Sequence, residues 1–381
     1  MTDNNENKVL NVPHLRFPEF SGEWEIYPLT DFMSFKNGMN PDAKRFGRGT
    51  KFISVMDILN NQFICYDNIR ASVEVVDGDI ETYGVNYGDI LFQRSSETLE
   101  DVGQANVYLD SKPAVFGGFV IRGKSKSNYY PMFFRYLLAS PTARKKIIVK
   151  GAGAQHFNIG QDGLSKVCLN IPSIQEQEKI AKLFECIDTR IATQNKIIEK
   201  LESLIKGIAH LVAGMGKPNI RIAECLECTS STLQESEVSD LGTYPVYGAN
   251  GIVGYLDSYN TSDEAIYIVK DGSGVGSVIY VKGRCSATGT LNILTAKQDY
   301  SLQFLYYLLR VFNYDPYKTG MAIPHIYFKD YGKAKIFCPP YAGQLRYAQM
   351  LDAIDTKLLT EQKFLISLNC QKQYLLRQMF I

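Results

Sequence analysis

Two stretches of the chain carry apolar residues at alternating spacings of three and four, which is typical of long helices with one apolar stripe. The stretches cover residues 172–212 and 339–381, and each begins at a proline, which suits a first helical turn. The pattern lasts for more than four heptads, so we predict two long helices. The first stripe consists of Ile180, Phe184, Ile187, Ile191, Gln194, Ile198, Leu201, Ile205, Ile208 and Val212, and the second of Tyr347, Leu351, Ile354, Leu358, Glu361, Leu365, Leu368, Lys372, Leu375 and Met379.

The two stretches are copies of one repeat, because they align without a gap at an offset of 167 residues. The first copy starts IPSIQEQEKIAKLFECIDTRI at Ile171, and the second starts CPPYAGQLRYAQMLDAIDTKL at Cys338. Repeated helices most simply bury their stripes against each other as an antiparallel pair. Gln194 and Glu361 are repeat equivalents near mid-helix, so we expect them to face each other and fix the register, unless the register is shifted by a heptad.

The segments ahead of the helices predict two versions of one strand-rich domain. Short apolar runs between Gly, Asn and Asp turns predict strands, and one longer apolar run in each segment predicts a helix. ILFQR (90–94) matches IYIVK (266–270), and GAGAQHF (151–157) matches GMAIPHI (320–326). We therefore predict an α+β protein with two similar domains separated by two long helices that form an antiparallel coiled coil. The boundaries are 1–171 for the first domain with an N-terminal extension, 172–212 for the first helix, 213–338 for a linker and the second domain, and 339–381 for the second helix.

Length and composition limit the possibilities further. The chain has 381 residues, more than the roughly 250–300 that one core supports, so two or more folded units are expected. It carries 41 Lys and Arg against 40 Asp and Glu, a net charge of +1, which disfavours a solitary basic nucleic-acid binder. Neither a signal peptide nor a long apolar span is evident, so we expect a cytoplasmic protein with reduced cysteines. The CxxC at 225–228 lacks a second pair, which favours buried thiols over zinc.

Four parts of the sequence, in this order, carry a resemblance to a known family. They are PHLRFPEF at 13–20 followed by Trp24, YGDILFQR ending at Arg94, the repeat from Ile171, and its second copy from Cys338. With two variable halves between the copies, the chain resembles the specificity subunit of type I restriction–modification enzymes. One departure is that the second copy has Gly343-Gln344-Leu345 where the first has Glu176-Gln177-Glu178.

The resemblance implies a DNA-recognition subunit without catalytic activity of its own. Each target-recognition domain would bind one half of a split sequence in double-stranded DNA, and the helices would dock two modification subunits that methylate adenine N6. Restriction subunits would add translocation and cleavage. No cofactor is then expected in this chain, whereas the partner subunits would use S-adenosylmethionine, ATP and magnesium. Because the two halves differ in sequence, the target should be asymmetric.

Two other functions are compatible with the sequence. The chain could be a coiled-coil assembly scaffold without its own DNA readout, or the specificity subunit of a complex that only methylates. A gel shift with and without a methyltransferase partner separates the first alternative from sequence recognition. The sequence does not separate a methylation-only complex from one that also restricts.

Three motifs that suggest catalysis have simpler explanations. Cys338-Pro339-Pro340-Tyr341 resembles an amino-methyltransferase motif, but a thiol accepts hydrogen bonds poorly and the repeat places this motif at a helix start. The glycines of 272–276 lie between two strand-like runs, where a tight turn is expected rather than a phosphate site. Glu361-Gln362-Lys363 lies on the predicted coiled coil. We therefore expect a protein that is not an enzyme by itself.

Candidate DNA contacts are polar and basic residues in predicted loops, because such groups bind phosphates and base edges. They fall in a basic loop at 37–51, in the turns after the two matched strands, in the stretches before each last strand, and in the turn of YPVYGANG. For each group, a solvated loop or an ordinary turn is the alternative. The candidates are Lys44, Arg45, Arg48, Lys51, Arg94, Ser95, Ser96, Gln155, His156, Asn158, Tyr247, Asn250, Lys270, Asp271, Ser273 and His325.

Overall fold

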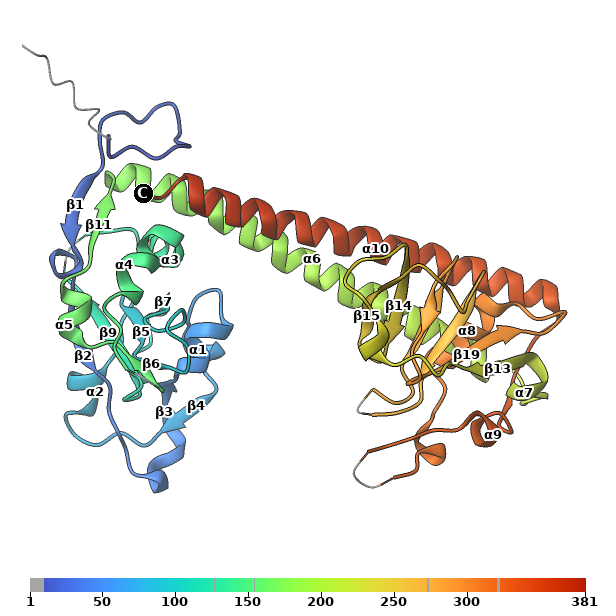
Figure 1. Ribbon diagram of the computed structural model, residues 1–381. Helices are drawn as coiled ribbons and strands as arrows, with labels where there is room; N and C mark the ends of the chain where they lie inside the picture. Colours follow the sequence, from blue (N-terminus) through green and yellow to red (C-terminus); the bar gives the residue numbers. More distant parts are fainter. Residues whose placement is uncertain (1–9, 127, 154, 273, 321–322) are drawn as a thin grey trace, which may run out of the picture. The chain divides into compact units, whose positions relative to one another are not determined.

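The computed structural model describes residues 10–381 except 127, 154, 273, 321 and 322. The chain divides into two compact units, Met1–Thr193 with Leu365–Ile381, and Gln194–Phe364. Each unit holds one strand-rich domain and part of two long helices, α6 and α10 (Figure 1). The α+β class expected from the sequence is confirmed.

The first domain is built on two small sheets and two strand pairs, one of which joins β6 and β10. One sheet has the order β2-β9-β5-β7, the second has the order β4-β3-β8, and β1 pairs with β11. The strands are β1 (Glu25–Pro28), β2 (Met33–Asn37), β3 (Phe46–Ile53), β4 (Ala71–Val73), β5 (Ile90–Gln93), β6 (Ser95–Ser96), β7 (Ala105–Val107), β8 (Val115–Phe116), β9 (Val120–Ser125), β10 (Phe157–Asn158) and β11 (Cys168–Ile171). The helices are α1 (Val55–Asn60), α2 (Asp79–Tyr83), α3 (Pro131–Ala139), α4 (Pro141–Ile148) and α5 (Gln161–Ser165).

The second domain repeats this plan with fewer helices. Its sheets have the orders β13-β19-β16-β17 and β15-β14-β18, and β12 pairs with β20. The strands are β12 (Ile220–Arg221), β13 (Leu226–Ser230), β14 (Tyr244–Gly248), β15 (Gly251–Leu256), β16 (Ala265–Val269), β17 (Val278–Val281), β18 (Ser286–Ala287), β19 (Leu291–Ala296) and β20 (Lys335–Ile336). The helices are α7 (Ile222–Cys225), α8 (Leu302–Arg310) and α9 (Phe328–Tyr331).

The sheets of the two domains correspond strand by strand. The four-stranded sheets are antiparallel throughout, with β5 and β16 at the same inner position. The three-stranded sheets each combine one antiparallel and one parallel pair, and the parallel pairs β3–β8 and β14–β18 occupy the same place. The prediction of two similar strand-rich domains is therefore confirmed.

One helix in each domain closes the core over the four-stranded sheet. Helix α3 begins at Pro131. Proline suits this position because the first N–H groups of a helix have no partner within the helix. The helix buries Phe133, Phe134 and Leu137 completely. In the second domain, Ser301 caps α8 by accepting a hydrogen bond from the backbone of Phe304. These helices deliver much of the apolar surface that holds each domain together.

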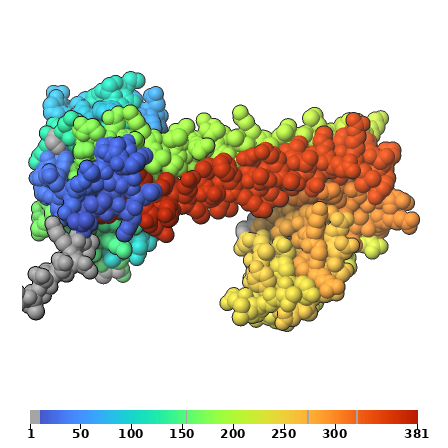
Figure 2. All heavy atoms as spheres, turned by 90° about the horizontal axis from the view of Figure 1, so that it is seen from above, coloured from blue at the N-terminus to red at the C-terminus, as the bar shows by residue number. Residues whose placement is uncertain are grey.

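The long helices α6 (Ile174–Gly214) and α10 (Tyr341–Gln378) lie side by side, as both views show (Figures 1 and 2). Within the first unit, the ring of Phe184 lies against that of Phe380, and Lys372 pairs with Asp188. Order along one helix thus reverses along the other, and the pair is antiparallel, as predicted. Helix α6 continues two residues beyond the predicted end at residue 212.

The apolar stripes pack against each other only in part. Ile205, Leu351 and Leu358 of the long helices pack together in the second unit, with Tyr307 of α8 in the same cluster. In contrast, Ile180 and Phe184 belong to the core of the first domain. Each stripe therefore packs partly against the other long helix and partly into a domain core. These two roles explain why the apolar pattern is longer than in an ordinary globular helix.

A tyrosine–aspartate bond ties each domain helix to the long helices. The Tyr136 hydroxyl on α3 donates to Asp188 at 2.9 Å, and the Tyr307 hydroxyl on α8 lies 3.5 Å from Asp355. The two aspartates are repeat equivalents. The same junction is thus built twice, more tightly in the first unit.

The expectation of a loop over residues 37–51 is wrong for its second half. Strand β3 begins at Phe46 and continues through two glycines, because Gly47 and Gly49 adopt positive φ angles of 95° and 87° at a bulge opposite β4. The glycines that suggest a loop instead let the strand continue.

Candidate functional site

The ends of β5 and β16 carry two of the predicted contact residues at the same structural position. Arg94 follows β5 and Lys270 follows β16. The backbone N–H of Arg94 donates to the carbonyl of Phe119 at 2.9 Å, and that of Lys270 donates to the carbonyl of Thr290 at 2.9 Å. Phe119 and Thr290 therefore occupy equivalent positions in the two domains, next to Arg94 and Lys270.

A returning segment completes the arrangement in each domain. The backbone of Asn158 exchanges two hydrogen bonds, of 2.8 and 2.9 Å, with the residue six positions before it, and His325 does the same. The Ser95 hydroxyl donates to the side-chain oxygen of Asn158. At the equivalent place, the Asp271 carboxylate lies 2.6 Å from Nδ1 of His325.

We call these residues the strand-end set of each domain. The set consists of Arg94, Ser95, Phe119 and Asn158 in the first domain, and of Lys270, Asp271, Thr290 and His325 in the second. Identical backbone bonds hold side chains of different chemistry in the two sets. The structure thus brings together six of the predicted residues and adds Phe119 and Thr290, which the sequence analysis missed.

The sequence match between the two histidines is wrong. Matching GAGAQHF with GMAIPHI places His156 opposite His325, whereas the backbone bonds make Asn158 the equivalent of His325. His156 and Gln155 are exposed, and Ser96 pairs with Phe157 in the short β6–β10 ladder. Ser273 lies outside the described residues.

The side chains of the strand-end sets are partly ordered by neighbours. Arg94 donates from Nη1 to the carbonyl of Gly118 at 3.2 Å, and the Phe119 side chain is 69% exposed. Because a carboxylate only accepts, the proton of the short bond to Asp271 must lie on Nδ1 of His325. The Thr290 hydroxyl is 2.8 Å from that of Thr288.

The basic residues predicted at 37–51 mostly bind groups of their own domain. Arg45 pairs with Asp79, Arg48 pairs with Glu74 at 2.7 Å, and Lys51 donates to the carbonyl of Ile69 at 2.7 Å. Both side chains of the Arg48–Glu74 pair are exposed, so Arg48 can release Glu74 and bind a phosphate at little cost. Lys44 is exposed.

Tyr247 and Asn250 occupy different environments. The ring of Tyr247 packs edge-on against that of Tyr267 with centroids 5.8 Å apart, and burial raises the pKa of its hydroxyl. Asn250 is exposed in the turn between β14 and β15, where Gly251 adopts a φ of 109°. Asn250 is therefore the more accessible of the two.

The predicted register pair of the long helices is in contact. Nε2 of Gln194 donates to the backbone carbonyl of Glu361 at 3.0 Å and to its carboxylate at 2.5 Å. Bonds from Lys357 and then Gln194 lower the pKa of the Glu361 carboxyl. Because Gln194 is buried, a shift of one heptad would leave its amide without this partner.

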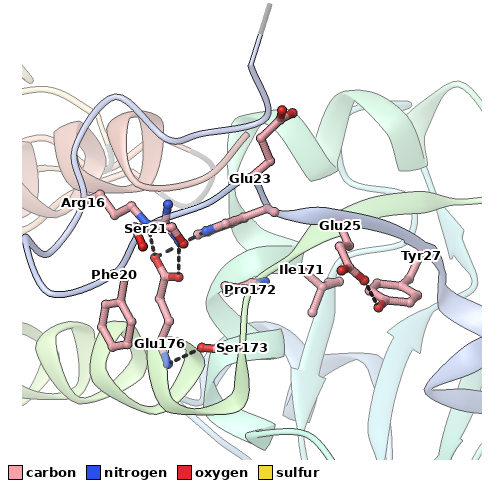
Figure 3. Close-up of a pocket in the computed structure, with 11 residues that line it drawn as sticks. Arg16, Phe20, Ser21, Glu23, Glu25, Tyr27, Ile171, Pro172, Ser173 and Glu176 are labelled. Carbon is pink, nitrogen blue, oxygen red and sulfur yellow. Dashed lines mark hydrogen bonds and ion pairs between the residues drawn. The ribbon is translucent and has the colours of Figure 1, made fainter.

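A buried carboxylate anchors the segment before β1 to the start of α6 (Figure 3). Glu176 accepts from Nε and Nη2 of Arg16 at 2.8 and 2.7 Å and from the indole N–H of Trp24 at 3.3 Å. These groups border a pocket of about 370 Å³. The repeat equivalent of Glu176 is Gly343, which has no side chain to accept these bonds. The sequence difference between the two copies therefore removes this anchor from the second copy.

Metal and membrane features complete the description. In the described part of the chain, no three His, Cys, Asp or Glu side chains gather into a group that could hold a metal ion. None of the helices in the described ranges is long and apolar enough to cross a bilayer.

Comparison with protein families decides the classification. The model of the type I restriction modification DNA specificity domain matches residues 21–203 and again residues 220–369. The chain belongs to this family. The two matches agree with the duplicated domain seen in the fold.

Relatives within the specificity-domain family are distant. The chain is 26% identical over 211 residues to the putative type I restriction enzyme MjaX specificity subunit of Methanocaldococcus jannaschii, covering 53% of this chain and 48% of that protein. It is 27% identical over 113 residues to the EcoprrI specificity subunit of Escherichia coli, covering 30% and 28%. These matches thus span half or less of the relatives' lengths.

Solved structures share the fold over nearly the whole chain. The type I restriction–modification S subunit from M. genitalium is similar with a TM-score of 0.62 and 17% identity, covering 97% of this chain and 99% of that one. A chain from a study of complex assembly and conformational transition in the type I system gives a TM-score of 0.57 and 13% identity, covering 93% and 96%. At these identities the likeness concerns the fold alone.

Proposed function

We propose that the chain is the sequence-specific DNA-recognition subunit of a type I restriction–modification complex. Each target-recognition domain reads one half of an asymmetric bipartite site in double-stranded DNA. The observation that carries the proposal is the duplicated domain whose strand ends keep the same backbone bonds and carry different side chains. Two such domains suit two different half-sites.

The long helices dock two modification subunits that methylate adenine N6. Support comes from a second apolar stripe on α6, outside the helix–helix contact, at heptad spacing: Ile197, Leu204 and Leu211 are 37%, 48% and 71% exposed. On this proposal, S-adenosylmethionine binds the modification subunits, while ATP and magnesium serve restriction subunits that join the same core. Exchanging both Leu204 and Leu211 for Ser should weaken subunit assembly in size-exclusion chromatography, whereas exchanging the exposed His210 for Ser should not.

DNA affinity is expected to depend on the partner subunits. A chain with a net charge of +1 neutralises few phosphates by itself, so its own binding should be weak. Fluorescence anisotropy with a labelled duplex, with and without the methyltransferase partner, measures this directly. Tight binding by the isolated chain that is insensitive to salt would contradict the proposal.

The test of recognition is a double variant in the first domain. Exchanging Arg94 and Ser95 for Ala in the assembled complex should weaken recognition of one half-site and leave the other unchanged. Methylome sequencing of cells that carry the wild type or the variant gives both half-sites at once. Equal weakening of both half-sites would refute separate readout, and a complex that binds duplexes without sequence preference would be an assembly scaffold.

A further inference from the structure

The strand-end sets differ at all four positions although the strands that lead to them are alike. Ile90–Phe92 of β5 and Ile266–Ile268 of β16 are fully buried and almost wholly apolar. In the strand-end sets, which combine the residues after these strands with two neighbouring segments, the side chains change from Arg, Ser, Phe and Asn to Lys, Asp, Thr and His. Because backbone bonds hold these positions, their side chains can vary without loss of the strands.

The chemistry of the first set suits guanine and thymine. The guanidinium of Arg94 gives one N–H to Gly118 and keeps further donors, which match O6 and N7 of guanine in the major groove. The adjacent Phe119 presents an exposed ring, the kind of group that contacts the thymine methyl. Phe119 also forms one wall of an apolar pocket of about 380 Å³.

The chemistry of the second set suits a base with an exocyclic amino group. Asp271 holds a proton of His325 on Nδ1, so the neutral form of the ring has the tautomer in which Nε2 accepts, which suits the amino group of adenine or cytosine. Both side chains are 36% exposed, which leaves the ring accessible. Thr290 lacks the ring of Phe119, and its hydroxyl already pairs with Thr288.

We infer that the strand-end sets are the base-reading positions of the two domains. The first set selects guanine and thymine through Arg94 and Phe119, and the second selects adenine or cytosine through His325 oriented by Asp271. This inference rests on the proposed function and narrows it from whole domains to four equivalent positions in each.

Exchanging residues between the sets tests the inference. Phe119→Thr gives the first domain the residue of the second, and the double variant Asp271→Ser with His325→Asn gives the second domain the pair of the first. Each complex, assembled with its methyltransferase partner, selects from a randomised duplex library, and sequencing gives the preference at every position. We expect about a tenfold or greater loss of preference at one or two positions of one half-site, with the other half-site unchanged.

Matched controls separate base reading from general damage. Tyr87 is 63% exposed in the first domain, so Tyr87→Thr removes an accessible ring outside the set. Asp263 precedes β16 at the end opposite to Lys270, so Asp263→Ser removes an exposed carboxylate away from the set. Both controls should select the wild-type sequence.

The possible results are distinguishable. If the wild-type complex selects no bipartite sequence, the proposed function fails. If it selects one and both exchanged complexes select the same sequence, the proposed function stands and this inference is overturned. A change that falls in the half-site of the other domain would also overturn it.

Discussion

Glu176→Ala should destabilise the first unit, because it removes the carboxylate that anchors the segment before β1. The side chain of Glu176 is 2% exposed and that of Arg16 is 13% exposed, so the pair is largely shielded from water. Trp24, which also donates to Glu176, is 2% exposed. The variant would leave a guanidinium and an indole N–H without their shared acceptor.

The expected loss is about 3 kcal/mol. Breaking a buried ion pair by removing one partner costs roughly 3–5 kcal/mol. Arg16 keeps its bonds to the carbonyls of Ser21 and Gly22, which places the loss at the lower end of that range. Glu176→Gln keeps one acceptor oxygen and should lose about 1–2 kcal/mol.

The chain contains one tryptophan, so its fluorescence reports on this site alone. Trp24 packs edge-on against Phe133 and Phe380, and urea unfolding of the first unit should shift its emission to longer wavelength. With a slope of about 3 kcal/mol per molar, Glu176→Ala should lower the midpoint by about 1 M. The control Glu178→Ala removes an exposed partner of Lys182 and should leave the urea midpoint nearly unchanged. Equal midpoints for the two alanine variants would refute the anchor.

Three further predictions concern the long helices. Exchanging both Gln194 and Glu361 for Leu should raise helix stability but allow other registers, which thermal melting and cysteine cross-linking across the pair would detect. The pKa of Glu361 is lowered from its ordinary value of 4.5, so its stabilising contribution is complete above that pH and is lost as the pH falls through the lower folded-state pKa. Helical circular dichroism during urea unfolding at about pH 7 and about pH 3 should show this loss, and Glu361→Gln should reduce it. Tyr136→Phe should cost about 1–2 kcal/mol and Tyr307→Phe much less, because only the first hydroxyl makes a short bond; equal costs in urea unfolding would contradict this.

Long-period features of the fold could be predicted from the sequence. The heptad stripes predict both helices because one residue in three or four must face the partner, and the repetition of the helix favours an antiparallel pair. Strands β5 and β16 are also predictable, since each is a short apolar run that ends at turn residues. In contrast, β13 (LECTS) is mostly polar and carries no apolar run that predicts a strand, because its position in the sheet depends on pairing with β19.

The candidate site was less predictable because it is assembled by long-range contacts. Arg94 and Lys270 were found from matching strands, whereas the role of Phe119 depends on its exposure and on a backbone bond to Arg94. The short GGF sequence between two strands is the signal that could have suggested an exposed aromatic turn. Alignment by residue type matched His156 with His325, whereas the backbone hydrogen bonds show that Asn158 is the structural equivalent of His325.

The shared core of the first unit has a consequence for biosynthesis. Leu376, Met379 and Phe380 are buried in the same cluster as Trp24 and Phe133, so residues far apart in synthesis complete one core. A ribosome adds about 5–20 residues per second, so the helix end that carries Phe380 emerges roughly 10–40 s after Thr193. The domain translated first must wait for that helix before its core is complete. Nascent-chain proteolysis should therefore find the first domain protected only after residues 376–380 have left the ribosome.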